Sequence, residues 1–354
     1  MLNGKQNTHQ INNFLDLALE SRLPDPSFLE RAYSVFQDFE GREKIHAPEH
    51  LSILKLQLLF QKLGVFEFAL SAREMISNVI GLDEITKSRI QVDNATVPES
   101  LLKLVPLMKS KNDARAIYSF FKLNETLGQK SSRSISLGFS LENSSKYLRR
   151  ISGKKVAIVG PGRAKIFRGA EIDKHDIVVR INVKGDDSLP DSKSHGSRTD
   201  VIYLNGVWTD NFAIQNYQRL LERNCHFVWR TKKRNCQILN SHSLTSIDNL
   251  ELSGSFLMLP RIVFDLLQFN PESITIYHND FYAGMSVYEE NFKSRRNAQT
   301  IWDLADHDLL TSLKFMNLIM LKSKISINFT DLEFGENTLD LKKYSNLIQR
   351  RYKS

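Results

Sequence analysis

One stretch, Lys154–Asn182, constrains the fold of this chain more than any other part of the sequence. It begins with a short β-branched run, Val156–Val159, of the kind that forms a buried strand. Gly160, Pro161 and Gly162 follow at once, and such a turn lets the backbone pass close to another group. The sequence therefore predicts a strand that ends in a tight glycine turn.

The next residues predict the rest of a strand–turn–helix–strand unit. We expect a helix to start within Arg163–Gly169, and a second strand, Asp176–Ile181, to end at Asn182. In such a unit, backbone N–H groups and a helix N-terminus lie at the carboxyl end of a parallel sheet, where phosphates bind. The pattern is equally that of an ordinary buried strand and turn, because Gly-Pro-Gly fits neither the P-loop nor the dinucleotide fingerprint.

Three segments in and after this unit carry a more specific pattern. Glu171–Asp176 reads Glu-Ile-Asp-Lys-His-Asp, Arg180–Asn182 reads Arg-Ile-Asn, and Gly196–Asn205 begins Gly-Ser-Arg-Thr-Asp and ends in Asn. In order and spacing these segments resemble the large sialylmotif of the sialyltransferases. The resemblance implies an α/β domain with a Rossmann-like, mostly parallel sheet, of the sialyltransferase-like glycosyltransferase type.

The net charge of the chain indicates which kinds of partner it could bind. The sequence has 48 Lys and Arg against 40 Asp and Glu, a net charge of +8. This charge suits a nucleotide, an acidic glycan or an anionic membrane face, and it also fits simple solubility. The two cysteines, Cys225 and Cys236, are too few for a disulfide scaffold or a cysteine-rich metal site. Because the basic residues are dispersed and no nucleic-acid-binding motif accompanies them, we expect no nucleic-acid partner.

The first part of the chain, residues 1–130, predicts an all-α domain of helical hairpins, similar to a helical-repeat array but without a clean period. Apolar residues recur at helical spacing in Gln10–Arg22, Ser27–Glu40, His50–Leu63, Val65–Ile80, Pro98–Leu107 and Asn112–Leu127. We expect this domain to be a structural cap; docking to a partner or a membrane-bound acceptor is the alternative. A polar, basic linker is expected at residues 131–148, and the transferase-like domain at residues 149–354.

The N-terminus, MLNGKQNTHQINNF, shows no basic-then-apolar signal pattern. No run of the sequence approaches the roughly 20 apolar residues that cross a bilayer. Animal Golgi sialyltransferases carry such an anchor and several cysteines, so the chain is more similar to a bacterial, cytoplasmic relative. Peripheral contact with the inner membrane stays open.

A second resemblance follows the predicted strand Ser273–Tyr277. Asp280, Phe281 and Tyr282 resemble the end of the small sialylmotif in bacterial sialyltransferases. Further upstream the family places Ser and Gly residues that contact the cytidine nucleotide, and this chain departs from that part of the motif. Ser255 is the residue that would take the role in a shifted register.

A third resemblance concerns His307, which precedes a predicted helix, Leu309–Lys322. The arrangement is similar to the very small sialylmotif, whose His is the catalytic base of the family. The motif usually has a Glu where this chain has Ser312. Helix capping or a plain surface position is the alternative for His307, and Asp306 is a candidate N-cap.

Together these resemblances imply one chemistry. A sialyl-type transfer moves a sugar from a cytidine monophosphate (CMP) donor to an acceptor hydroxyl; because the leaving group is a phosphate monoester, no metal or other cofactor is expected. His307 suits the base because imidazole titrates near neutrality, and Asp280 is a candidate for steadying an oxocarbenium-like transition state. The donor-binding candidates are Gly160, Pro161, Gly162, Arg163, Asn182, Asn205, Ser255 and Tyr282. The backbone amides of the glycine turn and the two asparagine side chains are expected to hold phosphate and ribose.

Three functions fit these patterns. The first is an inverting transferase that moves an acidic sugar, such as sialic acid or Kdo, from a nucleotide-sugar donor to a glycan or lipid-linked glycan in bacterial surface polysaccharide synthesis. The second is the same scaffold with a different phosphorylated donor, such as a ribosyl compound or another nucleotide sugar. The third is a non-catalytic helical adaptor with a degenerate transferase domain.

Overall fold

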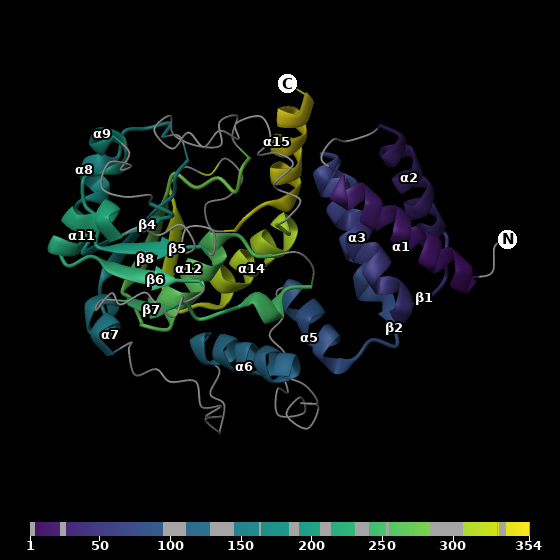
Figure 1. Cartoon of the computed structure of the whole chain (residues 1–354), viewed down its shortest axis with the longest axis horizontal. Coiled ribbons are helices and arrows are strands. Elements are labelled where there is room, and N and C mark those ends of the chain that lie inside the picture. Colours follow the sequence, from purple (N-terminus) through teal and green to yellow (C-terminus); the bar gives the residue numbers. More distant parts are fainter. Residues whose placement is uncertain are drawn as a thin grey trace.

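The structure is a computed structural model of the chain, and Figure 1 shows its course from the N-terminus to the C-terminus. It describes residues 4–21, 26–94, 111–127, 145–162, 164–183, 191–205, 214–230, 241–252, 255–283, 307–330, 332 and 338–353. The predicted helix Pro98–Leu107, most of the predicted linker at 131–148, and Cys236 lie outside these residues.

The N-terminal part is built mainly from helices. Its described elements, with η for a 3-10 helix, are α1 (Gly4–Glu20), α2 (Pro26–Glu40), β1 (Ile45–His46), η1 (Ala47–Glu49), α3 (His50–Lys62), α4 (Phe66–Met75), η2 (Ile76–Asn78), β2 (Val79–Ile80), α5 (Glu84–Asp93) and α6 (Lys111–Thr126). In α1, for example, Leu15 and Ala18 are buried at helical spacing. Figure 1 shows α1, α2 and α3 packed together on the side of the molecule away from the large sheet.

Two details of this part differ from the sequence prediction. The helix predicted over Val65–Ile80 ends at Met75, and Val79–Ile80 forms β2, which pairs in parallel with β1. Two adjacent β-branched residues favour such an extended conformation. Helix α5, which the periodicity did not predict, begins after Asp83, whose carboxylate accepts the Thr86 N–H at 2.9 Å as an N-cap.

The rest of the chain forms a parallel sheet. Among the described residues its strands pair in the order β7-β6-β5-β4-β3-β8-β9, and every pairing is parallel. The strands are β3 (Lys155–Val159), β4 (Ile177–Ile181), β5 (Val201–Leu204), β6 (His226–Trp229), β7 (Ser241–Ser243), β8 (Ser273–Tyr277) and β9 (Ser326–Phe329). The predicted α/β fold class, a Rossmann-like parallel sheet preceded by an all-helical part, is thereby confirmed.

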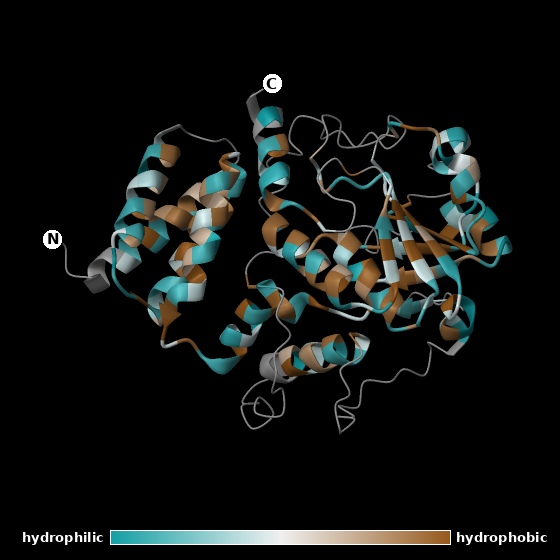
Figure 2. Cartoon of the chain, turned by 180° about the vertical axis from the view of Figure 1, so that it is seen from behind, coloured by the Kyte–Doolittle hydropathy of each residue, from teal (hydrophilic) through white to brown (hydrophobic). Residues whose placement is uncertain are grey.

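Both faces of this sheet are covered, as the near-continuous Val and Ile runs of its central strands require. Among the described residues, the helical elements of this part of the chain are α7 (Ser145–Ile151), α8 (Gly169–Ile172), α9 (Ser192–His195), η7 (Ile214–Tyr217), α11 (Gln218–Glu222), η8 (Asp248–Leu250), α12 (Met258–Leu267), α14 (Leu309–Lys322) and α15 (Leu341–Lys353). Val156 and Ile158 of β3 join the core formed with α12 and α14, whereas Ala157 and Val159 pack with Ile172 of α8. Figure 2 shows hydrophobic residues concentrated in the strands and in the helices that pack on them.

Helix α8 is shorter than predicted and starts later. It spans Gly169–Ile172, at the end of the segment in which we expected a helix to begin. Gly169 packs so closely on α9 that a Cβ there would lie 1.9 Å from the carbonyl oxygen of Ser192. The contact between the two short helices therefore fixes where α8 starts.

The strand order reverses between β3 and β8. The chain runs outward from β3 through β4, β5 and β6 to β7, and it returns through α12 to β8 on the other side of β3. In open α/β sheets, ligands bind outside the carboxyl ends of the strands at such a switch point. Gly160, Asn182, Asn205 and His278 directly follow β3, β4, β5 and β8. Four polar or glycine positions therefore share one edge of the sheet.

Candidate functional site

The glycine turn after β3 packs directly on the end of β8. The Gly160 N–H donates to the Tyr277 carbonyl at 2.8 Å, and the Gly162 N–H donates to the His278 carbonyl at 3.1 Å. A Cβ at either glycine would lie 2.5 Å from the His278 oxygen, so only glycine fits.

This packing bears on the role predicted for the turn. Both glycine N–H groups donate to carbonyl oxygens at or just after the end of β8, and Pro161 has no N–H to give. The expectation that the turn holds a phosphate through its backbone amides stays a prediction. Arg163, the next predicted donor contact, lies outside the described residues.

The residues that follow β8 form a turn with an unusual backbone. His278, Phe281 and Tyr282 all have positive φ, at 51°, 51° and 66°. The Asp280 carboxylate accepts the Tyr282 N–H at 3.0 Å and so supports the turn. Bulky residues rarely adopt this conformation, and such strained positions cluster at functional sites. The turn places the predicted residues Asp280 and Tyr282 together, beside the glycine turn.

Asn182 and Asn205 are brought together from neighbouring strands. The Asn182 side-chain oxygen accepts the Asn205 N–H at 2.9 Å. Asn182 has a φ of 53°, and asparagine tolerates this left-handed conformation better than most residues. The pair therefore marks the carboxyl ends of β4 and β5, where we expected both asparagines to contact a donor.

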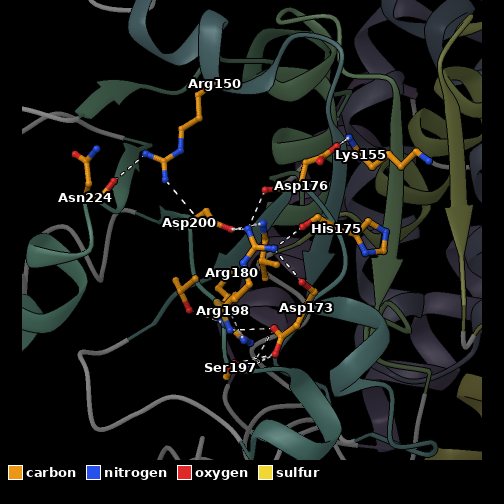
Figure 3. A network of polar contacts seen from close by, with 12 residues as sticks. Arg150, Lys155, Asp173, His175, Asp176, Arg180, Ser197, Arg198, Asp200 and Asn224 are labelled. Carbon is orange, nitrogen blue, oxygen red and sulfur yellow. Dashed lines mark hydrogen bonds and ion pairs between the residues drawn. The ribbon is translucent and has the colours of Figure 1, made fainter.

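Charged residues of the motif that resembles the large sialylmotif form hydrogen bonds mainly with backbone atoms (Figure 3). The Asp173 carboxylate accepts the N–H groups of Ser197 and Arg198 at 2.8 and 3.0 Å. Burial alone would raise the pKa of Asp173, but these hydrogen bonds outweigh it and lower that pKa below its usual value. Arg198 donates to the carbonyl oxygens of Asp173 and Asp176 and to the Asp200 carboxylate, each at 2.9 Å.

Arg180, inside the sheet, also forms hydrogen bonds with backbone atoms. It is buried in β4, where its Nε donates to the Thr199 hydroxyl at 2.8 Å. Its Nη2 donates to the carbonyl oxygens of His195 and Gly196 at 3.0 and 2.8 Å. Burial lowers the pKa of Arg180 to about 10, although nearby carboxylates oppose this shift. The arginine of the Arg-Ile-Asn segment thus fixes the backbone that leads into β5.

Two histidines that the sequence interpretation did not select lie behind the glycine turn. His195 Nε2 donates to the Gly162 carbonyl at 3.0 Å, and His278 Nε2 donates to the Ser194 carbonyl at 3.0 Å. Their ring centroids are 4.3 Å apart. Burial, followed by the neighbouring His278, lowers the pKa of His195 to about 4, so its imidazole is neutral. The position of His195 at the head of the Gly196–Asn205 segment was the available signal for this role.

Ser255 and His307, 52 residues apart, form the second centre of interest. The Ser255 hydroxyl lies 3.0 Å from His307 Nδ1, and the two residues form an isolated parallel bridge. His307 Nδ1 is also 3.3 Å from the Ser255 carbonyl, which can only accept, so this geometry assigns the proton to Nδ1. Nε2 then carries the lone pair that a general base needs.

The topology puts this pair on the same side as the sheet edge described above. Helices α12 and α14 lead into β8 and β9, so they run antiparallel to the strands, and their N-termini lie on the carboxyl side. Ser255 and His307 directly precede these two N-termini. The N-cap of α14 is Asp308, whose carboxylate accepts the Thr311 N–H at 3.0 Å. Asp306, the predicted N-cap, lies outside the described residues.

A carboxyl group lies beside Ser255 that the sequence did not point to. Glu251 Oε2 accepts the Phe256 N–H at 2.9 Å. Burial raises the pKa of Glu251 to about 8; the hydrogen bond from Phe256 opposes the shift, and the charge of Asp308 adds to it. This carboxyl group is therefore mostly protonated at neutral pH.

The described residues show neither a metal-binding cluster nor a helix that could cross a membrane. Within the part of the chain that the structure describes, no group of three or more His, Cys, Asp and Glu side chains is arranged to hold a metal ion. Searched over the same residues, none of the helices has the length and apolar character that crossing a membrane requires. The predicted independence from metal stays a prediction.

Comparison with known proteins gives weak similarities. No protein-family model matches the sequence, and no curated protein matches it. Among solved structures, the sialyltransferase CstII from Campylobacter jejuni, in complex with the substrate analogue CMP-3FNeuAc, is similar with a TM-score of 0.35 and 12% identity, over 50% of this chain and 80% of that one. A mammalian sialyltransferase in complex with Gal-beta-1-3GalNAc-ortho-nitrophenol has a TM-score of 0.32 and 14% identity, over 67% and 88% of the two chains. Both TM-scores are below 0.5, so neither similarity shows a function for this chain.

Proposed function

We propose that this chain is a glycosyltransferase that moves a sugar from a CMP-activated donor to a glycan hydroxyl. The observation that carries the proposal is the Ser255–His307 pair. Two separate sequence resemblances selected these residues, one for nucleotide contact and one for the base, and they are hydrogen-bonded at 3.0 Å. The contact orients the ring through Nδ1, and His307 Nε2 is proposed to transfer the proton.

The proposed reaction balances without a cofactor. His307 Nε2 takes the proton of the acceptor hydroxyl as that oxygen attacks the anomeric carbon, and the bond from this carbon to the phosphate oxygen breaks. CMP leaves with the electron pair of that bond, and the anomeric configuration inverts. Asp280 and Tyr282, in the turn after β8, are proposed to face the sugar as positive charge develops on it.

The donor is proposed to bind along the carboxyl edge of β3, β4 and β5. Asn182 and Asn205 form a hydrogen-bonded pair there, and Asn side chains offer both donors and acceptors to phosphate and ribose. The N–H groups of Gly160 and Gly162 are hydrogen-bonded to the end of β8 and to His278, so the two asparagines carry the proposed donor contacts. An acidic sugar such as sialic acid or Kdo, and a bacterial surface glycan as acceptor, are proposed from the sequence resemblance alone.

The experiment that tests this proposal is a thermal-shift series followed by a transfer assay. CMP and CMP-sialic acid are expected to raise the Tm, and UDP is not. Wild-type protein should release CMP from CMP-sialic acid or CMP-Kdo in the presence of a glycan acceptor, with equal rates in EDTA. A Tm shift with UDP or a ribosyl phosphate, but not with CMP, would support the alternative donor instead.

One observation favours the non-catalytic alternative. The N–H groups of Gly160 and Gly162, which a nucleotide phosphate was expected to use, are already hydrogen-bonded within the sheet. If no nucleotide raises the Tm and no CMP is released, the chain would be better described as a helical adaptor that carries a transferase-like domain.

A further inference from the structure

We propose that Arg73, in the helical N-terminal part, is a positioning residue that orients His307 through Asp308. The inference rests on the proposed role of His307 as the base. It assigns part of the active site to a segment that the sequence analysis expected to be a structural cap.

Asp308 links His307 to its surroundings. Its backbone N–H donates to the Ser255 carbonyl at 3.2 Å, so it extends the contact that joins His307 to Ser255. Its fully buried carboxylate caps α14 through the Thr311 N–H and accepts the Thr311 hydroxyl at 2.6 Å. A shift of Asp308 would therefore move the residue next to it, His307, and the first turn of α14 together.

Arg73 reaches this carboxylate from α4. Its fully buried guanidinium donates to Asp308 at 3.1 Å, and its other nitrogens donate to Asp93 of α5 at 2.7 and 3.0 Å. A further hydrogen bond joins Arg73 to the Thr311 hydroxyl. Burial alone would lower the pKa of Arg73, but Asp308 and Asp93 hold it above its usual value, so the group stays charged.

Other side chains of the helical part reinforce the same contact. Gln57 of α3 donates to Asp308 at 3.4 Å and accepts from Arg73 at 3.0 Å. Gln61 accepts the Leu310 N–H, in the first turn of α14, at 3.2 Å. Lys314 of α14 donates in return to Asp93 at 2.9 Å. Three of these four contacts join the two parts of the chain at the N-terminal half of α14.

The helical part also holds the segment that carries Ser255. Arg89 of α5 donates to the Asn249 carbonyl at 2.9 Å, and Ser119 of α6 donates to the Ser246 carbonyl at 3.2 Å. Residues of the helical part therefore contact both the segment upstream of Ser255 and the residues that follow His307. In Figure 1, α5 and α6 lie beside this segment and α14.

The free energy that it costs to bury this network indicates that its role is to position residues and not to stabilise the fold. Burying two carboxylates and a guanidinium is expensive, and apolar residues of similar volume often give equal or greater stability. A buried ionic network does specify one register, because displaced charges lose their partners. Arginine suits this task better than lysine, because its planar fork holds two carboxylates in a fixed geometry.

The test compares Arg73→Lys and Arg73→Met with wild type in the full-length protein. Arg73→Met should lower kcat by about 100-fold while the affinity for CMP is unchanged, because misplaced catalytic groups cost rate rather than donor binding. The kcat of Arg73→Lys should lie between those of wild type and Arg73→Met. Lysine keeps the positive charge but lacks the planar guanidinium that holds two carboxylates. The second readout, independent of turnover, is the His307 imidazole NMR signal and its titration, assigned with His307→Ala.

Phe36→Leu in α2 is the matched control for lost stability. Phe36 is buried in a ring cluster with Phe60 and Phe68, and α2 lies on the far side of the helical part from α14. Assays are run at a temperature at which circular dichroism shows every variant folded. The control should keep both the wild-type kcat and the His307 signal.

The outcomes separate the two proposals. A lower kcat with a changed His307 signal in Arg73→Met, but not in Phe36→Leu, supports positioning. Wild-type kcat and an unchanged His307 signal in Arg73→Met would overturn it while leaving the proposed function intact. A wild-type protein that neither binds CMP nor releases it from CMP-sugars would overturn the proposed function itself, and with it the catalytic meaning of the contact.

Discussion

The segment from Asp173 to Asn205 and the junction around Ser255 and His307 use their polar side chains in different ways. In the first, Asp173, Arg180 and Arg198 bond mostly to the backbone of one loop and its neighbouring strands. In the second, side chains from five separate segments meet each other, with Arg73 and Asp308 fully buried at the centre. The first region builds the edge of the sheet, and the second couples that edge to the helical part.

The two regions also differ in how clearly the sequence marks them. The segment from Asp173 to Asn205, which has the clearest resemblance, contains residues that fix a loop by hydrogen bonds. Their loss should lower the stability of the fold. The residue proposed for proton transfer lies where the resemblance is shorter, and its surroundings come from parts of the chain that no motif marks. Substitutions at the junction should therefore lower mainly the turnover, whereas substitutions in the loop should lower mainly the stability.

The largest effect is expected for His307→Ala. Loss of a general base lowers kcat by a factor of about 1,000, whereas the side chain is only partly buried and its removal should leave the Tm nearly unchanged. Release of CMP from CMP-sialic acid or CMP-Kdo measures the first quantity and calorimetry the second. Wild-type turnover in this variant would contradict the junction as the site of chemistry.

The second substitution addresses the loop. Arg180→Met removes the donors that hold the carbonyl oxygens of His195 and Gly196, which are left buried without them. The free energy of unfolding should fall by about 3 kcal/mol, because unsatisfied buried acceptors are costly. Urea unfolding measures this loss, and exposed Arg219→Met is the surface control.

The turnover of the same variant tests whether the loop takes part in the reaction. Turnover per folded molecule should survive in Arg180→Met at low temperature, because Arg180 bonds to backbone behind the edge. If kcat falls while the protein stays folded, then the loop takes part in the reaction and the division between the two regions is wrong.

Much of the fold follows from the sequence because its signals are local. The β-branched runs of β3 and β4 predicted buried strands, and the apolar stripe of Leu309–Lys322 predicted α14 with the bounds that the structure has. Helix α5 was not predicted because its apolar face is narrow. Helix α8 starts later than predicted because its contact with α9 fixes where it begins. Such contacts join residues far apart in sequence and leave no periodic trace.

The site was predictable in its members more than in their roles. Asn182, Asn205 and His307 were selected by order and spacing, and Ser255 by a shifted register. The structure brings the four residues together in two pairs. The glycine turn was assigned to phosphate binding because a turn sequence does not reveal which partner its N–H groups take. Arg73 carried no signal, because a single arginine on a helix looks like a surface charge until its tertiary partners are known.

A pH series on Glu251→Gln tests the junction without touching His307. The pKa of Glu251 is raised from 4.5 to about 8 in the folded protein, so folding binds a proton there between these values. The free energy of unfolding of the wild type should therefore fall as pH rises from 4.5 to 8, and stay lowered above 8. Glutamine is neutral throughout and should remove this dependence.

The expected result is a Tm for Glu251→Gln near that of wild type at pH 5 and higher at pH 9. The gain at pH 9 should be on the order of 2 kcal/mol for this partly exposed carboxyl group. Glu84→Gln, an exposed carboxyl on α5, is the control and should show no such trend. Parallel Tm–pH curves for wild type and Glu251→Gln would mean that the carboxyl is solvated and ionised beside Ser255.

The smallest effect should come from Tyr344→Phe, which tests whether the turn after β8 depends on distant helices as the junction does. The buried Tyr344 hydroxyl of α15 donates to the Phe281 carbonyl at 2.9 Å, and its ring packs edge-on against Phe66 of α4. Losing this hydrogen bond should cost about 1 kcal/mol in urea unfolding, since the carbonyl is left buried. Phe281 keeps its positive φ only while its surroundings hold it, so the turn carrying Asp280 should loosen and kcat fall severalfold. An unchanged kcat with the expected loss of stability would show that the turn holds its own shape, and that coupling to the helical part is confined to the Ser255–His307 junction.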